Sequence, residues 1–152
     1  RRRARVSASR RLPPVAIVDR ARPRSDRAFV RRVARAALAF ARREDLSVSL
    51  LLTDDAEIAA LHGQYLGDPT PTDVMSFELD GTAEIVVSVE TARRMARDHG
   101  HTARAELALY VVHGILHAAG YDDVRAAARK RMRAAEAEVL RRLKLRARPA
   151  DA

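Results

Sequence analysis

The sequence contains no cysteine, which excludes disulfide bridges and every metal or redox site built on thiolates. A transition-metal site in this chain must therefore use imidazole and carboxylate ligands. Histidine is also scarce, and the five available imidazoles are those of His62, His99, His101, His113 and His117. The position of each histidine is therefore informative.

Long hydrophobic runs are absent as well. The longest uncharged apolar runs, such as residues 107–112, are far too short to span a bilayer, so we expect no transmembrane segment and no membrane partner. Hydrophobic residues nevertheless make up 47% of the chain, which is typical of a globular protein. The 152 residues suffice for one domain with one sizeable core.

Lysine is nearly absent, and arginine dominates the basic residues. Lys and Arg number 29 against 20 Asp and Glu, and the resulting net charge of +9 favours polyanionic partners such as nucleic acid. A high arginine content can equally reflect genome composition, so charge alone does not decide the partner. The arginine-rich stretches at 31–35 and 125–133 fit either a solvated face or an RNA-binding surface.

The distribution of charged, apolar and proline residues predicts one folded unit with two short extensions. Residues 1–14 are rich in arginine, lack acidic residues and end in two prolines, which predicts a flexible basic arm. The single folded domain is expected to cover residues 15–143, and residues 144–152 are expected to form a tail. Because no apolar segment of the kind found in export signals follows the arm, we expect a cytoplasmic protein.

Hydrophobic periodicity and capping residues predict an order of strands and helices. Ser25 or Asp26 is the expected N-cap of the first helix, Gly100 and Gly120 end later helices, and residues 80–81 form a hairpin turn. This order predicts an α+β fold with a small mixed four-stranded sheet packed with about five helices. We expect strands at 15–18, 46–53, 73–79 and 84–89, and helices at 27–42, after the cap at 53–54, and at 90–98, 102–119 and 124–143.

His113 and His117 lie four residues apart in the helix expected at 102–119. Residues at this spacing occupy one helical face about 5–6 Å apart, so both imidazoles can bind one metal ion. Gly120 permits the left-handed turn that returns the chain across this face, and Asp123 follows three residues later. Two imidazoles and one carboxylate leave a fourth position for water, as catalytic zinc sites require. The spacing therefore predicts a catalytic zinc centre.

Each of these residues also has a structural interpretation. A histidine pair in an apolar helix can belong to the core, Asp123 stands where the last helix begins and could cap it, and Asp122 could cap or coordinate instead. A zincin protease carries Glu directly after its first histidine, whereas this chain has Gly114 there. Peptide hydrolysis of the zincin type is therefore not expected.

The residues around the histidine pair resemble a known signature. The motif of the YbeY family of bacterial endoribonucleases is closely matched by residues 112–122, Val-His-Gly-Ile-Leu-His-Ala-Ala-Gly-Tyr-Asp. The family's second hallmark resembles residues 71–77, Pro-Thr-Asp-Val-Met-Ser-Phe, and its next strand resembles residues 84–88. The resemblance implies a compact α+β domain, a zinc ion held by three side chains, and a role in ribosomal RNA maturation and ribosome quality control.

By this resemblance His113 and His117 are the first two metal ligands and the catalytic centre. The third ligand, normally histidine in the family, is Asp123 here. A carboxylate in this position remains compatible with zinc and also admits other divalent transition metals. A second departure is Leu66, which replaces the arginine that the family usually places near the site, where it suits contact with phosphate.

Four other residues are candidates for supporting roles. Arg94 and Arg104 are candidates to replace the missing phosphate partner. Ser76 alternates with apolar neighbours, so it either faces the cleft and contacts substrate or fits under a helix as a small residue. Glu106 either orients a metal ligand or is a solvated helix carboxylate. The remaining histidines are expected on surfaces or at helix ends.

Three functions follow from these patterns. The first is a zinc-dependent single-strand endoribonuclease acting on ribosomal RNA, with the ribosome as partner and no DNA substrate. The second is a metalloprotease-like or other zinc hydrolase, which Gly114 disfavours. The third is a non-catalytic ribosome-assembly or RNA-binding factor, which Leu66 favours because an apolar side chain cannot stabilise phosphate charge. The oligomeric state stays open at this stage.

Overall fold

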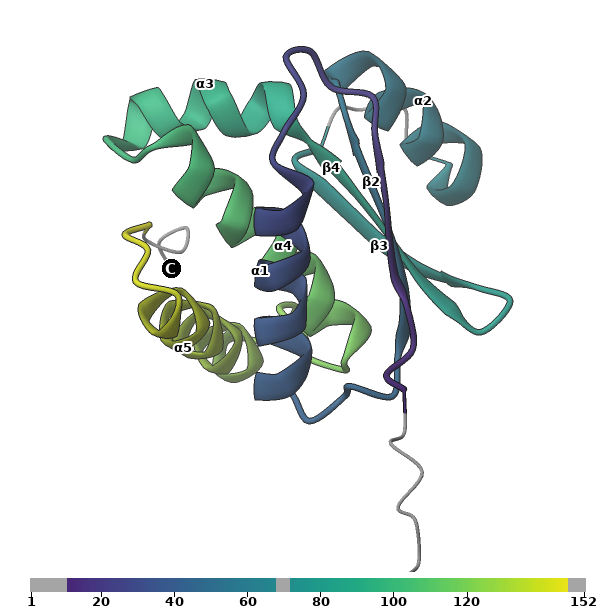
Figure 1. Ribbon diagram of the computed structural model, residues 1–152, viewed down its shortest axis with the longest axis vertical. Helices are drawn as coiled ribbons and strands as arrows, with labels where there is room; N and C mark the ends of the chain where they lie inside the picture. The colour runs from purple at the N-terminus through teal and green to yellow at the C-terminus, as the bar shows by residue number, and fades with distance from the viewer. Residues whose placement is uncertain (1–10, 68–71, 148–152) are drawn as a thin grey trace, which may run out of the picture.

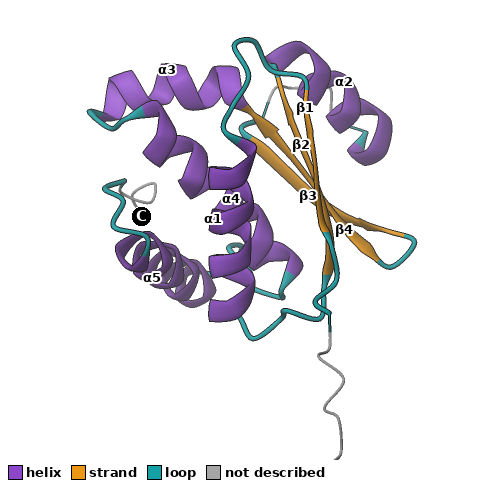
Figure 2. Ribbon diagram, viewed as in Figure 1, coloured by secondary structure: helices purple, strands orange, loops and turns teal. Residues whose placement is uncertain are grey.

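The computed structural model describes residues 11–67 and 72–147, except for the side chain of Leu66. The strands form one sheet and the helices pack around it (Figure 1, Figure 2). The order of elements agrees with the sequence prediction, and their ends differ from it by at most two residues. The elements are β1 (Val15–Asp19), α1 (Arg27–Phe40), β2 (Ser47–Thr53), α2 (Asp55–Leu66), β3 (Val74–Leu79), β4 (Thr82–Ser88), α3 (Val89–His99), α4 (Ala103–Ala118) and α5 (Ala126–Arg142).

The sheet is mixed and has the strand order β1-β2-β4-β3. β1, β2 and β4 run parallel, whereas β3 is antiparallel to β4 and joins it through a tight hairpin. The two turn residues, Asp80 and Gly81, have positive φ values of 51° and 79°, as a type I′ turn requires. The predicted α+β class, with a mixed four-stranded sheet and five helices, is confirmed.

The two faces of the sheet carry different cores. Figure 1 shows α1, α4 and α5 on one side of the sheet and α2 on the other. Because side chains alternate along a strand, β2 and β4 send residues to both sides. The main core under α1 and α4 receives Leu50, Leu52, Ile85 and Val87, and a smaller core under α2 joins Ile58, Met75 and Val86.

α4 is the central helix and carries both predicted histidine ligands. Residues 105–112 are buried without a break, so this helix has no solvent-facing stripe over its middle turns. It packs against the sheet, α1, α3 and α5. Within the described part of the chain, neither α4 nor another helix is long and apolar enough to cross a membrane. A helix held from several sides is a rigid support for His113 and His117 near its end.

Gly114 marks a close approach of α4 to the sheet. A Cβ atom at this position would lie 2.6 Å from Cγ2 of Ile85 and 3.2 Å from Cγ2 of Val74. We expect Gly114→Ala to lower the free energy of unfolding by about 1–2 kcal/mol, because overpacking outweighs the helix propensity that alanine gains. Thermal unfolding should show a Tm lower by roughly 2–8 °C. An unchanged or higher Tm would contradict this packing.

Asp55 ties the start of α2 to the corner between β4 and α3. Its carboxylate accepts hydrogen bonds from the hydroxyls of Ser88 and Thr91 and lies 3.1 Å from Nη1 of Arg94. Burial by itself raises the pKa of Asp55, but these hydrogen bonds outweigh burial and lower the pKa from 3.8 to about 2. The folded protein therefore favours the ionised form of this carboxyl group.

This depressed pKa predicts a pH-dependent stability. The contribution of Asp55 is complete above its unfolded value of 3.8 and is lost as the pH falls through about 2. We expect Asp55→Asn to lower the free energy of unfolding by about 1–2 kcal/mol at neutral pH and by much less near the folded-state pKa. Urea unfolding of the wild type and of Asp55→Asn at the two pH values measures this loss of stability. An equal loss at both pH values would contradict the link between the ionisation of Asp55 and stability.

The predicted arm and tail lie partly outside the described residues, which omit 1–10 and 148–152. Close to the arm's end, the carbonyl groups of Pro13 and Pro14 accept hydrogen bonds from Arg35 and from the backbone of Val48. After α5, Leu145 packs against the main core. The domain boundaries at residues 14 and 143 stay a prediction.

Candidate metal centre

His113, His117 and Asp123 come together at the end of α4. The Nε2 atoms of His117 and His113 lie 3.2 Å and 3.9 Å from Oδ2 of Asp123. One ligand atom from each residue lies within 4.8 Å of the others. Ligand atoms around tetrahedral zinc stand about 3.4 Å apart, given bonds of about 2.0–2.2 Å. The three side chains therefore have the spacing of a metal site that is nearly assembled.

The loop after α4 decides which aspartate joins the histidines. Gly120 has a φ of 106°, which only glycine adopts readily, and it turns the chain back across the helix end. Asp122 then accepts a hydrogen bond from the backbone N–H of Val124 at 2.9 Å. Arg125 is the N-cap residue of α5. The capping alternative for Asp123 is therefore wrong, and its carboxylate is directed to the histidines instead.

Glu136 of α5 contacts His113, and the sequence patterns did not predict this contact. Its Oε1 atom lies 2.7 Å from Nδ1 of His113, and the residue is only 3% exposed. A carboxylate that holds one imidazole nitrogen leaves the other nitrogen free to face a metal ion. A signal was present, because Glu136 falls in the buried stripe of α5 together with Met132, Ala135, Val139 and Leu140.

The electrostatic surroundings of His113 favour its charged form. Burial by itself lowers the pKa of His113, but the hydrogen bond and charge of Glu136 outweigh burial, and Asp73 and Asp123 add to them. The net effect raises the pKa of His113 above its usual 6.5. A divalent cation would be stabilised by the same negative charges, so this environment suits a metal ion.

The cluster lines an open cleft between α4 and the β3–β4 hairpin. Its volume is about 830 Å³, and its wall includes Arg43, His62, Ser76 and Phe77 besides the three clustered residues. A smaller pocket of about 90 Å³ adjoins it and is lined by His113, Asp123, Arg129, Arg133 and Glu136. The three candidate metal ligands therefore stand where a large ligand has access.

Comparison with known proteins identifies the family. The family profile described as Endoribonuclease YbeY matches residues 19–144, most of the chain. This chain belongs to the YbeY endoribonuclease family. A YbeY endoribonuclease of Heliobacterium modesticaldum is 40% identical over 116 residues, which cover 64% of this chain and 70% of that protein.

Further relatives extend the match. A YbeY endoribonuclease of Desulfitobacterium hafniense is 38% identical over 128 residues, covering 74% of this chain and 82% of that protein. The solution structure of a Thermotoga maritima protein matches with a TM-score of 0.62 at 26% identity, over 86% of this chain and 92% of that one. The family and fold inferred from the two sequence motifs are thus confirmed.

Within this YbeY-family fold, Ser76 lies at the cleft but is engaged with the protein. Its hydroxyl donates a hydrogen bond to the carbonyl oxygen of Gly114 at 3.1 Å, which fits its interpretation as a small residue under a helix. The same side chain lines the cleft, so its role in substrate binding stays a prediction. His62, expected on a surface or helix end, lies in the middle of α2 and also lines the cleft.

Glu106 matches neither of its two interpretations. It is 1% exposed, so it is not a solvated helix carboxylate. It does not orient the clustered histidines, because its oxygens lie beside His99 and His101. Glu106 lies seven residues before His113, and helical spacing therefore suggested that both share the face of α4 that points to the cleft. However, a helix that is buried on all sides has no single face that must point to the cleft. Glu136 holds the orienting position instead.

The arginines proposed to replace the family's usual arginine lie elsewhere. Arg94 pairs with Asp55, and the guanidinium of Arg104 lies 3.7 Å from the centroid of the Phe29 ring. Neither of them lines the cleft. The side chain of Leu66 is outside the described part, so the consequence of this departure stays a prediction.

Proposed function

We propose that this YbeY-family protein is a zinc-dependent, single-strand-selective endoribonuclease. It acts on ribosomal RNA in the cytoplasm, in ribosomal RNA maturation and ribosome quality control, with the ribosome as its partner. The observation that carries the proposal is the cluster of His113, His117 and Asp123 on an open cleft, in a chain of an endoribonuclease family.

The donor set fits a catalytic zinc ion. His113, His117 and Asp123 would hold it with two nitrogens and one oxygen, which leaves room for water or substrate. When bound, zinc supplies Lewis acidity at the phosphodiester and charge stabilisation in the transition state. Glu136 keeps the Nδ1 side of His113 engaged, so Nε2 is the nitrogen available to the ion. Another divalent transition metal with the same ligand preference also fits this set.

Basic residues beside the cluster suit an RNA substrate. Arg129 and Arg133, from the arginine-rich stretch of α5, line the pocket next to His113. Nε and Nη1 of Arg133 are buried and have no hydrogen-bond partner among the described residues, so a phosphate oxygen that reached them would satisfy two unused donors. An open cleft admits unpaired nucleotides, whose bases are accessible to proteins in a way that those of duplex RNA are not.

The two alternative functions have less support. A protease of the zincin type needs Glu at the position of Gly114, where a side chain would collide with Ile85 of the sheet. The non-catalytic assembly factor rests on Leu66 alone. It differs from the endoribonuclease in two respects, because RNA binding would then need no metal and would lead to no cleavage.

The experiment is a cleavage assay with purified protein, with and without a metal chelator. We expect cleavage of single-stranded ribosomal RNA fragments that the chelator abolishes and added zinc restores. The same sequences as duplex RNA or as DNA should be cut much more slowly, and casein should not be cut. Metal-independent RNA binding without cleavage would establish the assembly factor, and casein cleavage without RNA cleavage would establish the protease.

A further inference from the structure

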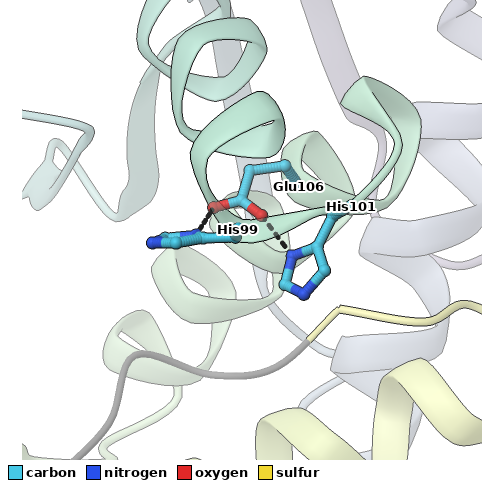
Figure 3. A group of neighbouring side chains, drawn as sticks. All are labelled: His99, His101 and Glu106. Carbon is cyan, nitrogen blue, oxygen red and sulfur yellow. Dashed lines mark hydrogen bonds and ion pairs between the residues drawn. The ribbon is translucent and has the colours of Figure 1, made fainter.

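A second cluster of metal-ligating side chains lies away from the cleft, where α3 ends and α4 begins. It consists of His99 at the end of α3, His101 in the connecting turn and Glu106 in α4 (Figure 3). Gly100 has a φ of 69°, and this left-handed conformation reverses the chain between the two histidines. Both imidazoles consequently point toward the same carboxylate (Figure 3).

The two imidazoles approach different oxygens of Glu106. Nδ1 of His99 lies 3.2 Å from Oε1, and Nδ1 of His101 lies 2.7 Å from Oε2. One ligand atom from each of the three residues lies within 4.8 Å of the others. Ligand atoms around zinc stand about 3.4 Å apart, so a small movement closes the site. The side chain of His99 is 41% exposed and has room for that movement.

Glu106 is a buried carboxylate whose charge requires compensation. It is 1% exposed, and the ion pairs it makes within the described part of the chain are with His99 and His101, not with arginine or lysine. A divalent cation held between the imidazoles and the carboxylate would neutralise this buried charge.

We propose that His99, His101 and Glu106 bind a divalent transition-metal ion, zinc in the first instance. Two imidazoles and one carboxylate form a donor set that zinc accepts, and the exposed edge of His99 gives the ion a way in. Glu106 and His113 are seven residues apart on α4, or about 10 Å along the helix axis. The site is therefore separate from the cleft, and its ion fastens the end of α3 to the start of α4.

The same contacts are also compatible with a hydrogen-bonded cluster that binds no metal. In that case each imidazole donates one Nδ1–H to the carboxylate, and the folded protein binds no zinc at this corner. The number of zinc ions bound by each chain therefore separates the two cases. This count does not depend on whether the protein cleaves RNA.

The test is a zinc count on the full chain. The protein is stripped with a chelator and dialysed against a small excess of Zn²⁺, and bound zinc is measured per chain. We expect two ions in the wild type and one in the His117→Ala variant, which lacks the cleft site. Adding His101→Ala to that variant should remove the remaining ion. Adding His62→Ala, which removes an imidazole outside the cluster, should leave it bound.

Two further measurements guard against loss of fold. His99→Gln replaces the exposed member of the cluster and leaves the contact between His101 and Glu106 in place. It should therefore weaken zinc binding in the His117→Ala background at least about tenfold while circular dichroism stays unchanged. Zinc at a hundredfold excess over its Kd should raise the Tm of His117→Ala by roughly 5–10 °C. It should leave the Tm of the variant that also carries His101→Ala unchanged.

The zinc counts distinguish a failure of the second site from a failure of the cleft site. One ion in the wild type and none in His117→Ala would overturn the second site. An ion that survives both His117→Ala and His101→Ala would overturn it as well. One ion in both the wild type and His117→Ala, lost on adding His101→Ala, would support the second site and contradict the cleft site.

Discussion

Replacing His117 by alanine is expected to lower the rate of RNA cleavage by at least about 1000-fold. His117 lies 3.2 Å from Asp123 and supplies one of two imidazoles in the cleft cluster. Without it, two ligands remain, which is too few to hold zinc against water. The expected readouts are one zinc ion fewer per chain and a single-turnover rate near that of the metal-free protein.

The control for this variant is Glu138→Gln, a surface substitution on α5. Glu138 pairs with Arg141 and Arg142 and lines neither pocket of the cluster. The cleavage rate of this control should stay within about twofold of the wild type, because surface substitutions away from a site usually change little. If His117→Ala retained both full zinc content and full activity, the metal-centre assignment would be wrong.

Replacing Glu136 by glutamine is expected to weaken zinc binding in the cleft by about 10–100-fold, with a parallel loss of activity. Glutamine keeps the shape and a carbonyl oxygen near Nδ1 of His113 but removes the negative charge. Because the hydrogen bond and charge of Glu136 raise the pKa of His113, the pKa of this imidazole should fall in the metal-free variant. Competition with a chelator measures the affinity, and NMR titration of the imidazole measures the pKa.

The matched control is Glu138→Gln on the same helix. Glu138 pairs with Arg141 and Arg142 at the surface and does not line either pocket of the cluster. Removal of its charge should leave zinc affinity unchanged. Equal effects of the two substitutions would show that Glu136 acts only through the overall charge of α5, which would remove its positioning role.

Local sequence patterns were enough to predict most of the secondary structure. The apolar periodicity located α1, Asp26 and Asp54 cap the helices that follow them, and the pair at 80–81 forms the hairpin turn. These features depend on residues within a few positions of one another, so they can be predicted from the sequence alone. The spacing of His113 and His117 belongs to the same class, because α-helical geometry alone brings them onto one face.

The partners of the buried carboxylates could not be predicted in this way. Glu136 reaches His113 across 23 positions, and this contact depends on how α5 packs against α4. Periodicity shows that a residue lies in a buried stripe, but it does not say which residue of another element it meets. For the same reason Glu106 was assigned to the wrong surroundings, although its own helix was located correctly.

The sequence by itself determined the family, the order of elements and the pair of histidines on one helix. These follow from short-range geometry and from motifs that are contiguous along the chain. Only the tertiary structure decided that Asp123 faces the histidines rather than capping α5, that Gly114 allows α4 to approach the sheet, and that Glu136 holds His113. Each of these depends on the relative placement of α4, α5 and the sheet, which is set by packing between segments that are distant in the sequence.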